Sequence, residues 1–168
     1  GNPLRDEIKK YYGSTVGMAG RGESIPQKNN KCEIDPTKVD EFGIPVLKFN
    51  YQWTDNEIKQ VGHMHDTFEE ILHNMGGEVL GTKPTLKEKN GILAPGEIIH
   101  EVGTTRMGND PKTSVVNQHQ QLHNVKNVFI VDAGPFVSQA DKNPTWTILA
   151  LSWRTSDYII EQLKMQNI

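Results

Sequence analysis

The clearest periodic pattern in the chain predicts a long helix near residues 55–75. Its apolar side chains recur every three or four positions, as they do along one face of an α-helix. Thr54 and Glu57 have the spacing of a capping box at the helix start, and Gly76-Gly77 is a stop signal directly after it. We expect the apolar face of this helix to pack against the rest of the fold.

A second helix is predicted near residues 144–164. Asn143 is a suitable N-cap, and Pro144 suits the first helical position, where a missing N–H costs nothing. The first half of the helix is apolar on nearly every side as far as Trp153, so we expect it to be buried between other elements. Its first turn presents free backbone N–H groups and a positive dipole end, which suit an electron-rich ligand.

Short extended segments separated by turns predict the strands of a mainly antiparallel sheet. Residues 44–51 have the pattern of a strand, with Pro45 confined to its start or edge. Residues 78–82 predict another strand, and the apolar run 128–131 predicts a buried one. Together with the two long helices, these strands place the chain in the α+β class.

The first 36 residues show little periodicity and carry several glycines. Segment 17–22 reads Gly-Met-Ala-Gly-Arg-Gly, which raises the question of a phosphate-binding loop. Its spacing is not Gly-x-Gly-x-x-Gly, and no buried strand precedes it. We therefore expect a flexible loop there.

Composition narrows the class of protein. At 168 residues the chain has the length of one domain with one core, so residues 1–168 are expected to form a single domain. The net charge is -3, so the chain lacks the excess of positive charge that is typical of nucleic-acid-binding proteins. No apolar run has the length of a membrane span, and a single cysteine, Cys32, excludes an internal disulfide.

The histidines do not have the spacing of a metal site. His63 and His65 are two positions apart on the predicted helix and therefore point in different directions. His65 and His73 share a face but lie about 12 Å apart along the axis. His119 and His123 precede a turn into a strand and are not read as helical. No metal is expected.

Three ordered sequence blocks carry a resemblance to a known family. They are His100–Gly108 (His-Glu-Val-Gly-Thr-Thr-Arg-Met-Gly), Val131–Ala133 (Val-Asp-Ala) and Asn143–Ile148 (Asn-Pro-Thr-Trp-Thr-Ile). Their order and spacing resemble the C-terminal domain of the glucose–methanol–choline (GMC) family of FAD-dependent oxidoreductases, over roughly residues 95–160. The short segments before residue 46 are similar to strands of that family's substrate domain.

The resemblance implies roles for individual residues. His100 matches the family's active-site histidine, which would accept the proton of the substrate hydroxyl; imidazole suits this task near pH 7. Asn143 matches the second member of the catalytic pair and would hold the substrate oxygen. For Arg106 two roles remain open: a contact with a phosphate or the substrate, and an ion pair within the scaffold. The positions that match the family's flavin-lining residues are Asp132, Ala133, Asn143, Pro144 and Thr145.

The chain contains no Gly-x-Gly-x-x-Gly after a strand, the motif that binds the pyrophosphate of a dinucleotide. In the family this motif lies in the N-terminal part. The resemblance therefore implies a C-terminal fragment: part of the substrate domain plus the last strand and helix of the FAD domain. We expect FAD in the complete protein but not on this fragment, whose partner would be the N-terminal FAD-binding part. Alone, the fragment would expose apolar surface and self-associate.

The activity implied is oxidation of the CH–OH group of a small-molecule alcohol, sugar- or polyol-like, by hydride transfer to the flavin. The fragment alone is expected to be inactive. Oxidase and dehydrogenase both remain open, because reactivity with oxygen has no local motif. Two alternatives from other classes are a non-catalytic binding or assembly module that kept the fold, and a small metal-dependent hydrolase that uses the histidines.

Overall fold

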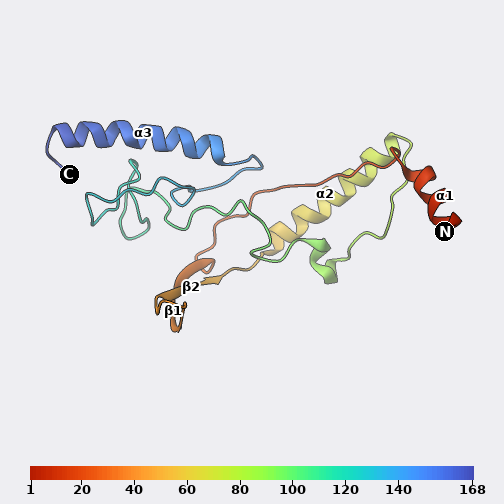
Figure 1. Cartoon of the computed structure of the whole chain (residues 1–168), viewed down its shortest axis with the longest axis horizontal. Helices are drawn as coiled ribbons and strands as arrows, with labels where there is room; N and C mark the ends of the chain where they lie inside the picture. The colour runs from red at the N-terminus through yellow and green to blue at the C-terminus, as the bar shows by residue number, and fades with distance from the viewer.

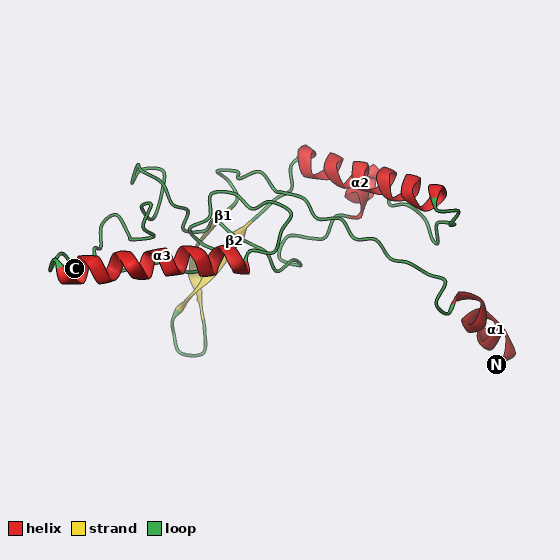
Figure 2. Cartoon of the chain, turned by 90° about the horizontal axis from the view of Figure 1, so that it is seen from above, coloured by secondary structure: helices red, strands yellow, loops and turns green.

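A computed structural model describes residues 1–168 as an elongated molecule of helices, loops and one small sheet (Figure 1). Helix α1 lies at one end and helix α3 at the other, and the β1–β2 hairpin projects from the side between them (Figures 1 and 2). The elements in chain order are α1 (Asn2–Tyr11), β1 (Lys31–Val39), β2 (Pro45–Asn50), α2 (Asp55–Asn74), the 3-10 helix η1 (Leu86–Gly91) and α3 (Thr145–Lys164).

Helix α2 forms where the pattern predicts it, and both halves of its capping box are present. The Glu57 carboxylate accepts a hydrogen bond from the Thr54 backbone N–H at 2.7 Å, and the Thr54 hydroxyl accepts one from the Asn56 N–H at 3.2 Å. Gly76, with φ of 74°, follows the C-cap residue Met75. The predicted start and stop signals are therefore confirmed.

Glu57 also ties the N-terminal loop to α2. It is buried, with 3% of its surface exposed, and its second oxygen accepts a hydrogen bond from the Ile25 backbone N–H at 3.1 Å. Burial raises the pKa of Glu57, but the hydrogen bonds from Thr54 and Ile25 outweigh burial, so the pKa lies below its ordinary value. The ionised form is thus the one that the fold stabilises.

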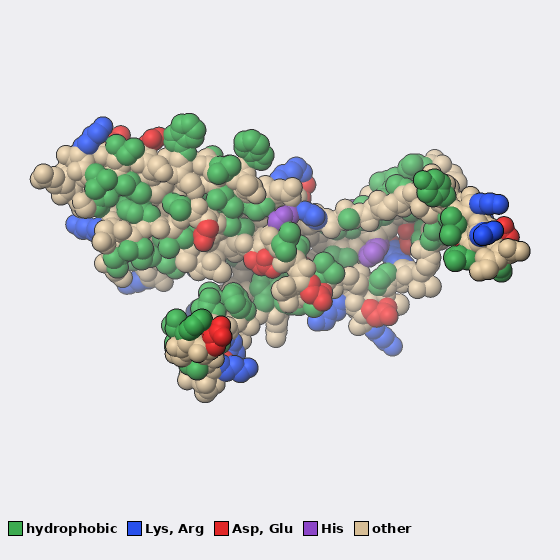
Figure 3. Space-filling view, in the orientation of Figure 1, with side chains coloured by type: hydrophobic (Ala, Val, Ile, Leu, Met, Phe, Trp, Pro, Cys, Tyr) green, Lys and Arg blue, Asp and Glu red, His purple; other side chains and the backbone are tan.

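Helix α3 also forms at the predicted place, but its start differs from the prediction. Pro144 occupies the N-cap position and no side chain caps the helix. Asn143 was expected to be the cap; its side-chain oxygen instead accepts a hydrogen bond from Arg21. The expected burial of the first half is also wrong, because Trp146 and Trp153 are 84% and 74% exposed. Figure 3 shows hydrophobic side chains standing out over α3, where no other element covers them.

The hairpin confirms the strand predicted at residues 44–51. Strands β1 and β2 pair antiparallel, with Ile34 opposite Leu47. At the turn, the Asp40 carboxylate accepts hydrogen bonds from the backbone N–H groups of Phe42 and Ile44, both at 2.9 Å. The α+β class is consistent with this sheet, although the sheet has only two strands.

Two predicted strands are absent. Residues 78–82 form no strand. Segment 128–131 forms only an isolated bridge, Phe129 to Gln121, and Val131 is 47% exposed. A buried strand needs neighbouring strands to satisfy its backbone groups, and beside this segment the structure has only the short bridge to Gln121. Helix α1, in contrast, forms where no regular element was predicted; its apolar side chains, Leu4 and Ile8, are exposed.

The buried core is small and lies between α3 and the loops before it. Only 8 of 168 residues are buried, and Val116 and Phe136 are the buried hydrophobic ones. Beside them the Thr155 hydroxyl donates to the Gln120 side-chain oxygen at 2.5 Å. The single large core expected from the chain length is therefore not formed. None of the helices combines the length and the apolar composition that crossing a membrane requires.

Candidate functional site

Arg21 joins the two residues expected to form the catalytic pair. Its Nη1 donates a hydrogen bond to Asn143 Oδ1 at 3.2 Å and lies 3.5 Å from His100 Nδ1. His100 is half-buried, whereas Arg21 and Asn143 are exposed. Three residues that are far apart in the sequence therefore meet at one guanidinium nitrogen.

The contact with Arg21 gives one ring nitrogen of His100 the role of acceptor. Arginine has only N–H donors, so His100 Nδ1 must be the acceptor in its contact with Arg21. For Asn143, the side-chain oxygen is occupied by Arg21, which leaves the amide N–H groups available to donate to a substrate oxygen.

Two glycines explain why Arg21 reaches this position. Residues 17–22 form a loop, as predicted, and the segment passes directly along α2 (Figure 1). A Cβ added to Gly20 would lie 2.4 Å from Met64 Sδ, and one added to Gly22 would lie 2.0 Å from Gln60 Oε1. Because the glycines on both sides of Arg21 face α2, the arginine between them lies on the opposite side, toward His100.

The first two sequence blocks lie side by side through backbone hydrogen bonds. The N–H of Gly103 donates to the Ala133 carbonyl at 3.2 Å, and the N–H of Thr105 donates to the Gly134 carbonyl at 3.1 Å. The Asp132 carboxylate accepts a hydrogen bond from the Gly134 N–H at 2.7 Å. Ser152 of α3, four residues after the third block, donates to the Val131 carbonyl at 2.8 Å, and Arg21 links the first and third blocks through His100 and Asn143.

An open hollow of about 400 Å³ lies at the start of α3. It includes Asn143 and Pro144 from the predicted flavin-lining set but not Asp132, Ala133 or Thr145. The hollow thus overlaps the predicted cofactor residues in part. Met107, Phe136, Thr147 and Leu151 supply part of its wall.

The basic side chains around this region differ in how they are paired. Lys142 forms an ion pair with Asp141, and the hydrogen bond from Lys142 lowers the pKa of that carboxyl. Arg106 donates from Nε to the Thr113 carbonyl at 2.9 Å and has no ion pair, so the structure does not contain the scaffold ion pair considered for it. Arg21 has no carboxylate partner either.

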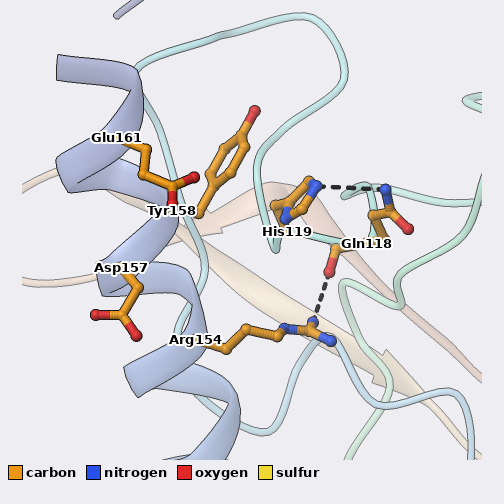
Figure 4. Close-up of a pocket in the computed structure, with 6 residues that line it drawn as sticks. All are labelled: Gln118, His119, Arg154, Asp157, Tyr158 and Glu161. Carbon is orange, nitrogen blue, oxygen red and sulfur yellow. Dashed lines mark hydrogen bonds between the residues drawn. The ribbon is translucent and has the colours of Figure 1, made fainter. Parts of the chain in front are cut away.

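A second hollow, of about 270 Å³, lies on the C-terminal half of α3 (Figure 4). The His119 ring stacks on the Tyr158 ring with centroids 3.9 Å apart, and Arg154 donates to the Gln118 carbonyl at 2.5 Å. These contacts hold the loop before residue 123 against α3. None of the predicted site residues lines this hollow.

The remaining histidines have ordinary surroundings. His65 Nε2 lies 3.0 Å from the Asn90 carbonyl oxygen, and His123 Nε2 lies 2.8 Å from the Ser114 hydroxyl. His63 and His73 are exposed on α2. The structure contains no group of three or more side chains with the arrangement of a metal site.

The chain matches a known protein family and several characterised relatives. The family described as GMC oxidoreductase matches residues 26–152. The chain is 32% identical over 159 residues to 2-methyl-1,2-propanediol dehydrogenase of Mycolicibacterium austroafricanum and 27% identical over 170 residues to the gluconate 2-dehydrogenase flavoprotein of Pantoea cypripedii. It is 27% identical over 125 residues to pyranose 2-oxidase of Tricholoma matsutake.

These alignments cover most of the chain but a minor part of each relative. They include 95%, 96% and 74% of the chain, but only 28%, 26% and 21% of the three relatives, respectively. The chain therefore spans less than a third of the length of the relatives it matches.

Proposed function

The chain belongs to the GMC oxidoreductase family, and from this premise we propose that residues 1–168 are the C-terminal module of an FAD-dependent alcohol oxidoreductase. The module would contain part of the substrate domain and the last strand and helix of the FAD domain. Its substrate would be a sugar- or polyol-like alcohol, in keeping with relatives named for a diol, gluconate and pyranose. The observation that carries the proposal is the convergence of His100 and Asn143 on one nitrogen of Arg21.

The start of α3 has the properties that a flavin would need. No side chain caps this helix, so the backbone N–H groups of its first turn remain free to donate to an electron-rich ring. The adjacent hollow offers Asn143 and Pro144 to a ligand. We assign Asp132, Ala133, Asn143, Pro144 and Thr145 to the flavin environment, with Asp132 shaping the loop through Gly134. FAD, when bound, would accept the hydride from the carbinol carbon.

Two residues of the protein would accept the proton of the substrate hydroxyl and orient its oxygen. His100 Nδ1 acts as the acceptor in the contact with Arg21, so it can accept the hydroxyl proton once that contact opens. The amide N–H of Asn143 would hold the substrate oxygen while the amide oxygen stays with Arg21. Proton acceptance and orientation are thus separate tasks for the two residues.

The exposed apolar side chains support a partner for this module. Trp146, Leu149 and Trp153 on α3 are exposed, as are Leu47 and Phe49 on the hairpin. The proposed partner is the N-terminal FAD-binding part of the same protein, which would cover these surfaces. The isolated chain is then expected to self-associate and not to retain FAD.

Stopped-flow reduction of the flavin in the complete enzyme tests the proposal. Replacing His100 with Ala removes the base, and the rate of flavin reduction should fall by roughly 10²–10⁴-fold. His63→Ala is the matched control, because His63 is exposed on α2 and makes no hydrogen bond with Arg21 or Asn143. Wild-type reduction rates in H100A across neutral pH would place the base elsewhere. No reduction by any alcohol in the wild type would favour the non-catalytic module.

A further inference from the structure

We propose that Arg21 binds a carboxylate of the substrate, so that the alcohol oxidised at this site is a hydroxy acid. The inference rests on the proposed function, which supplies the reaction, and adds the class of substrate. It assigns a role to the Gly20-Arg21-Gly22 segment, which the sequence pattern alone leaves as a loop.

The first observation is an unneutralised charge inside the site. Arg21 forms no ion pair, and its two polar contacts are both with neutral groups, the amide oxygen of Asn143 and the imidazole of His100. Both contacts use Nη1, so the N–H groups on Nη2 and Nε have no hydrogen-bond partner. A guanidinium with five donors therefore still has an open edge for an incoming oxyanion.

The second observation is that the backbone holds the arginine in place. A Cβ at Gly20 would meet Met64 and one at Gly22 would meet the end of the Gln60 side chain, so the segment lies directly against α2. Three residues further on, the Ile25 N–H is bonded to the buried Glu57. Contacts of the backbone with α2 on both sides of Arg21 thus fix the position from which its guanidinium extends.

A carboxylate fits this position better than a phosphate does. One guanidinium matches one carboxylate in charge, and its planar fork can donate two parallel hydrogen bonds to it. A phosphate with nearly two charges would need a second cation. The neighbouring lysine, Lys142, is already paired with Asp141.

The contacts of Arg21 also suggest a direction for the reacting hydroxyl. Arg21 Nη1 lies 3.2 Å from Asn143 Oδ1 and 3.5 Å from His100 Nδ1. A carboxylate bound at the guanidinium would therefore direct a hydroxyl on the next carbon, or the one after it, toward both residues. The natural class is a 2- or 3-hydroxy acid.

The carboxylate would also release the base. In the structure Arg21 Nη1 contacts His100 Nδ1 at 3.5 Å, and a carboxylate on the Nη2–Nε edge would draw the guanidinium away from the neutral imidazole with a full negative charge. Nδ1 is then free to accept the hydroxyl proton while the carbinol C–H leaves as hydride to the flavin. The C–OH group becomes a carbonyl, and the product is a keto acid. A neutral alcohol would have to displace the same contact without this compensation.

Kinetics of the complete flavoenzyme with matched substrates test the inference. We would compare lactate with propane-1,2-diol, and gluconate with glucitol, and measure kcat/KM for flavin reduction with each. In the wild type the acid of each pair should be preferred. Arg21→Gln should lower kcat/KM for the preferred acid by about 10- to 100-fold, the usual worth of a charge-assisted contact. For the neutral partner kcat/KM should stay within about threefold of the wild type.

Two further variants distinguish the effect of the planar guanidinium geometry from the effect of its positive charge. Arg21→Lys keeps the charge but loses the planar fork and should give an intermediate loss with the acids. Arg5→Gln removes the same charge from α1, at the far end of the molecule (Figure 1), and should leave the acid-to-diol ratio unchanged. Calorimetric titration with propanoate, which has no hydroxyl to oxidise, should show at least tenfold weaker binding to R21Q than to the wild type.

The outcomes distinguish the two proposals. If neutral alcohols reduce the flavin in a His100-dependent manner but acids do not, or if R21Q lowers both substrates equally, the assignment of Arg21 is wrong and the proposed function stands. Equal binding of propanoate to both proteins also refutes the assignment. If neither acids nor alcohols reduce the flavin in the wild type, the proposed function fails and the assignment fails with it.

Discussion

The close approach of the N-terminal loop to α2 leads to a prediction that separates two neighbouring glycines. A Cβ at Gly20 would lie 2.4 Å from Met64 Sδ, 3.2 Å from Met64 Cγ and 3.2 Å from Phe68 Cζ. A Cβ at Gly22 would meet the amide of Gln60, with the closest atom at 2.0 Å. The closer contact is the less costly one, because the end of a glutamine side chain can swing into solvent.

The two alanine substitutions should therefore change the free energy of unfolding by different amounts, or even in opposite directions. Gly20→Ala must displace Met64 and Phe68 together, and overpacking of this kind costs typically 1–3 kcal/mol. The flexible methionine brings our expectation to about 1 kcal/mol. Gly22→Ala should be neutral or stabilise by about 0.5 kcal/mol, because an alanine restricts the unfolded chain and only Gln60 has to move.

Thermal unfolding of the complete enzyme gives the stability of each variant, and kcat/KM with the preferred substrate gives its consequence at the site. Gly20→Ala should shift the loop and lower kcat/KM, since Arg21 is the next residue. The double variant Gly22→Ala/Gln60→Ala is the control: it removes the amide that a Cβ at position 22 would meet, so it should restore any stability or kcat/KM that Gly22→Ala loses. A Gly22→Ala variant as destabilised as Gly20→Ala would refute the reasoning, as would two variants without any effect.

Three further predictions concern single contacts. Glu57→Gln should lower the free energy of unfolding by about 1–2 kcal/mol at pH 7. The pKa of Glu57 in the folded protein lies below the ordinary 4.5, so the advantage of the wild type should be full above pH 4.5 and disappear as the pH falls through the folded pKa. Denaturant unfolding at several pH values measures this difference. Asn143→Ala should change the melting temperature little, since Asn143 does not cap α3, yet slow flavin reduction by roughly 10²-fold; a large stability loss with unchanged kinetics would contradict this. Gly134→Ala would place a Cβ 2.2 Å from Thr105 Oγ1 and should cost about 1–3 kcal/mol in thermal unfolding, against a neutral Gly17→Ala control that meets no atom within 4 Å.

The elements that were predictable from the sequence are those whose signals are local. Helix α2 has its capping box and its glycine stop within the segment itself, and the hairpin has its turn between two short apolar runs. The resemblance to the GMC family also predicted that His100 and Asn143 act as a pair, and in the structure both contact Arg21. Arg21 was not predictable, because its position depends on two missing side chains and on a helix that begins more than thirty residues later.

The prediction of a buried strand and the prediction of a buried helix failed for the same physical reason. Segment 128–131 and the first half of α3 have the apolar composition of interior elements, yet Val131, Trp146 and Trp153 are exposed. Sequence composition reports the environment for which a segment is suited, whereas burial also requires a surface to pack against. The hydrogen bond from Ser152 to the Val131 carbonyl already holds the two segments side by side. In the proposed enzyme a single docking event with the N-terminal part would therefore bury both segments, and it would bring the flavin to the uncapped end of α3 at the same time.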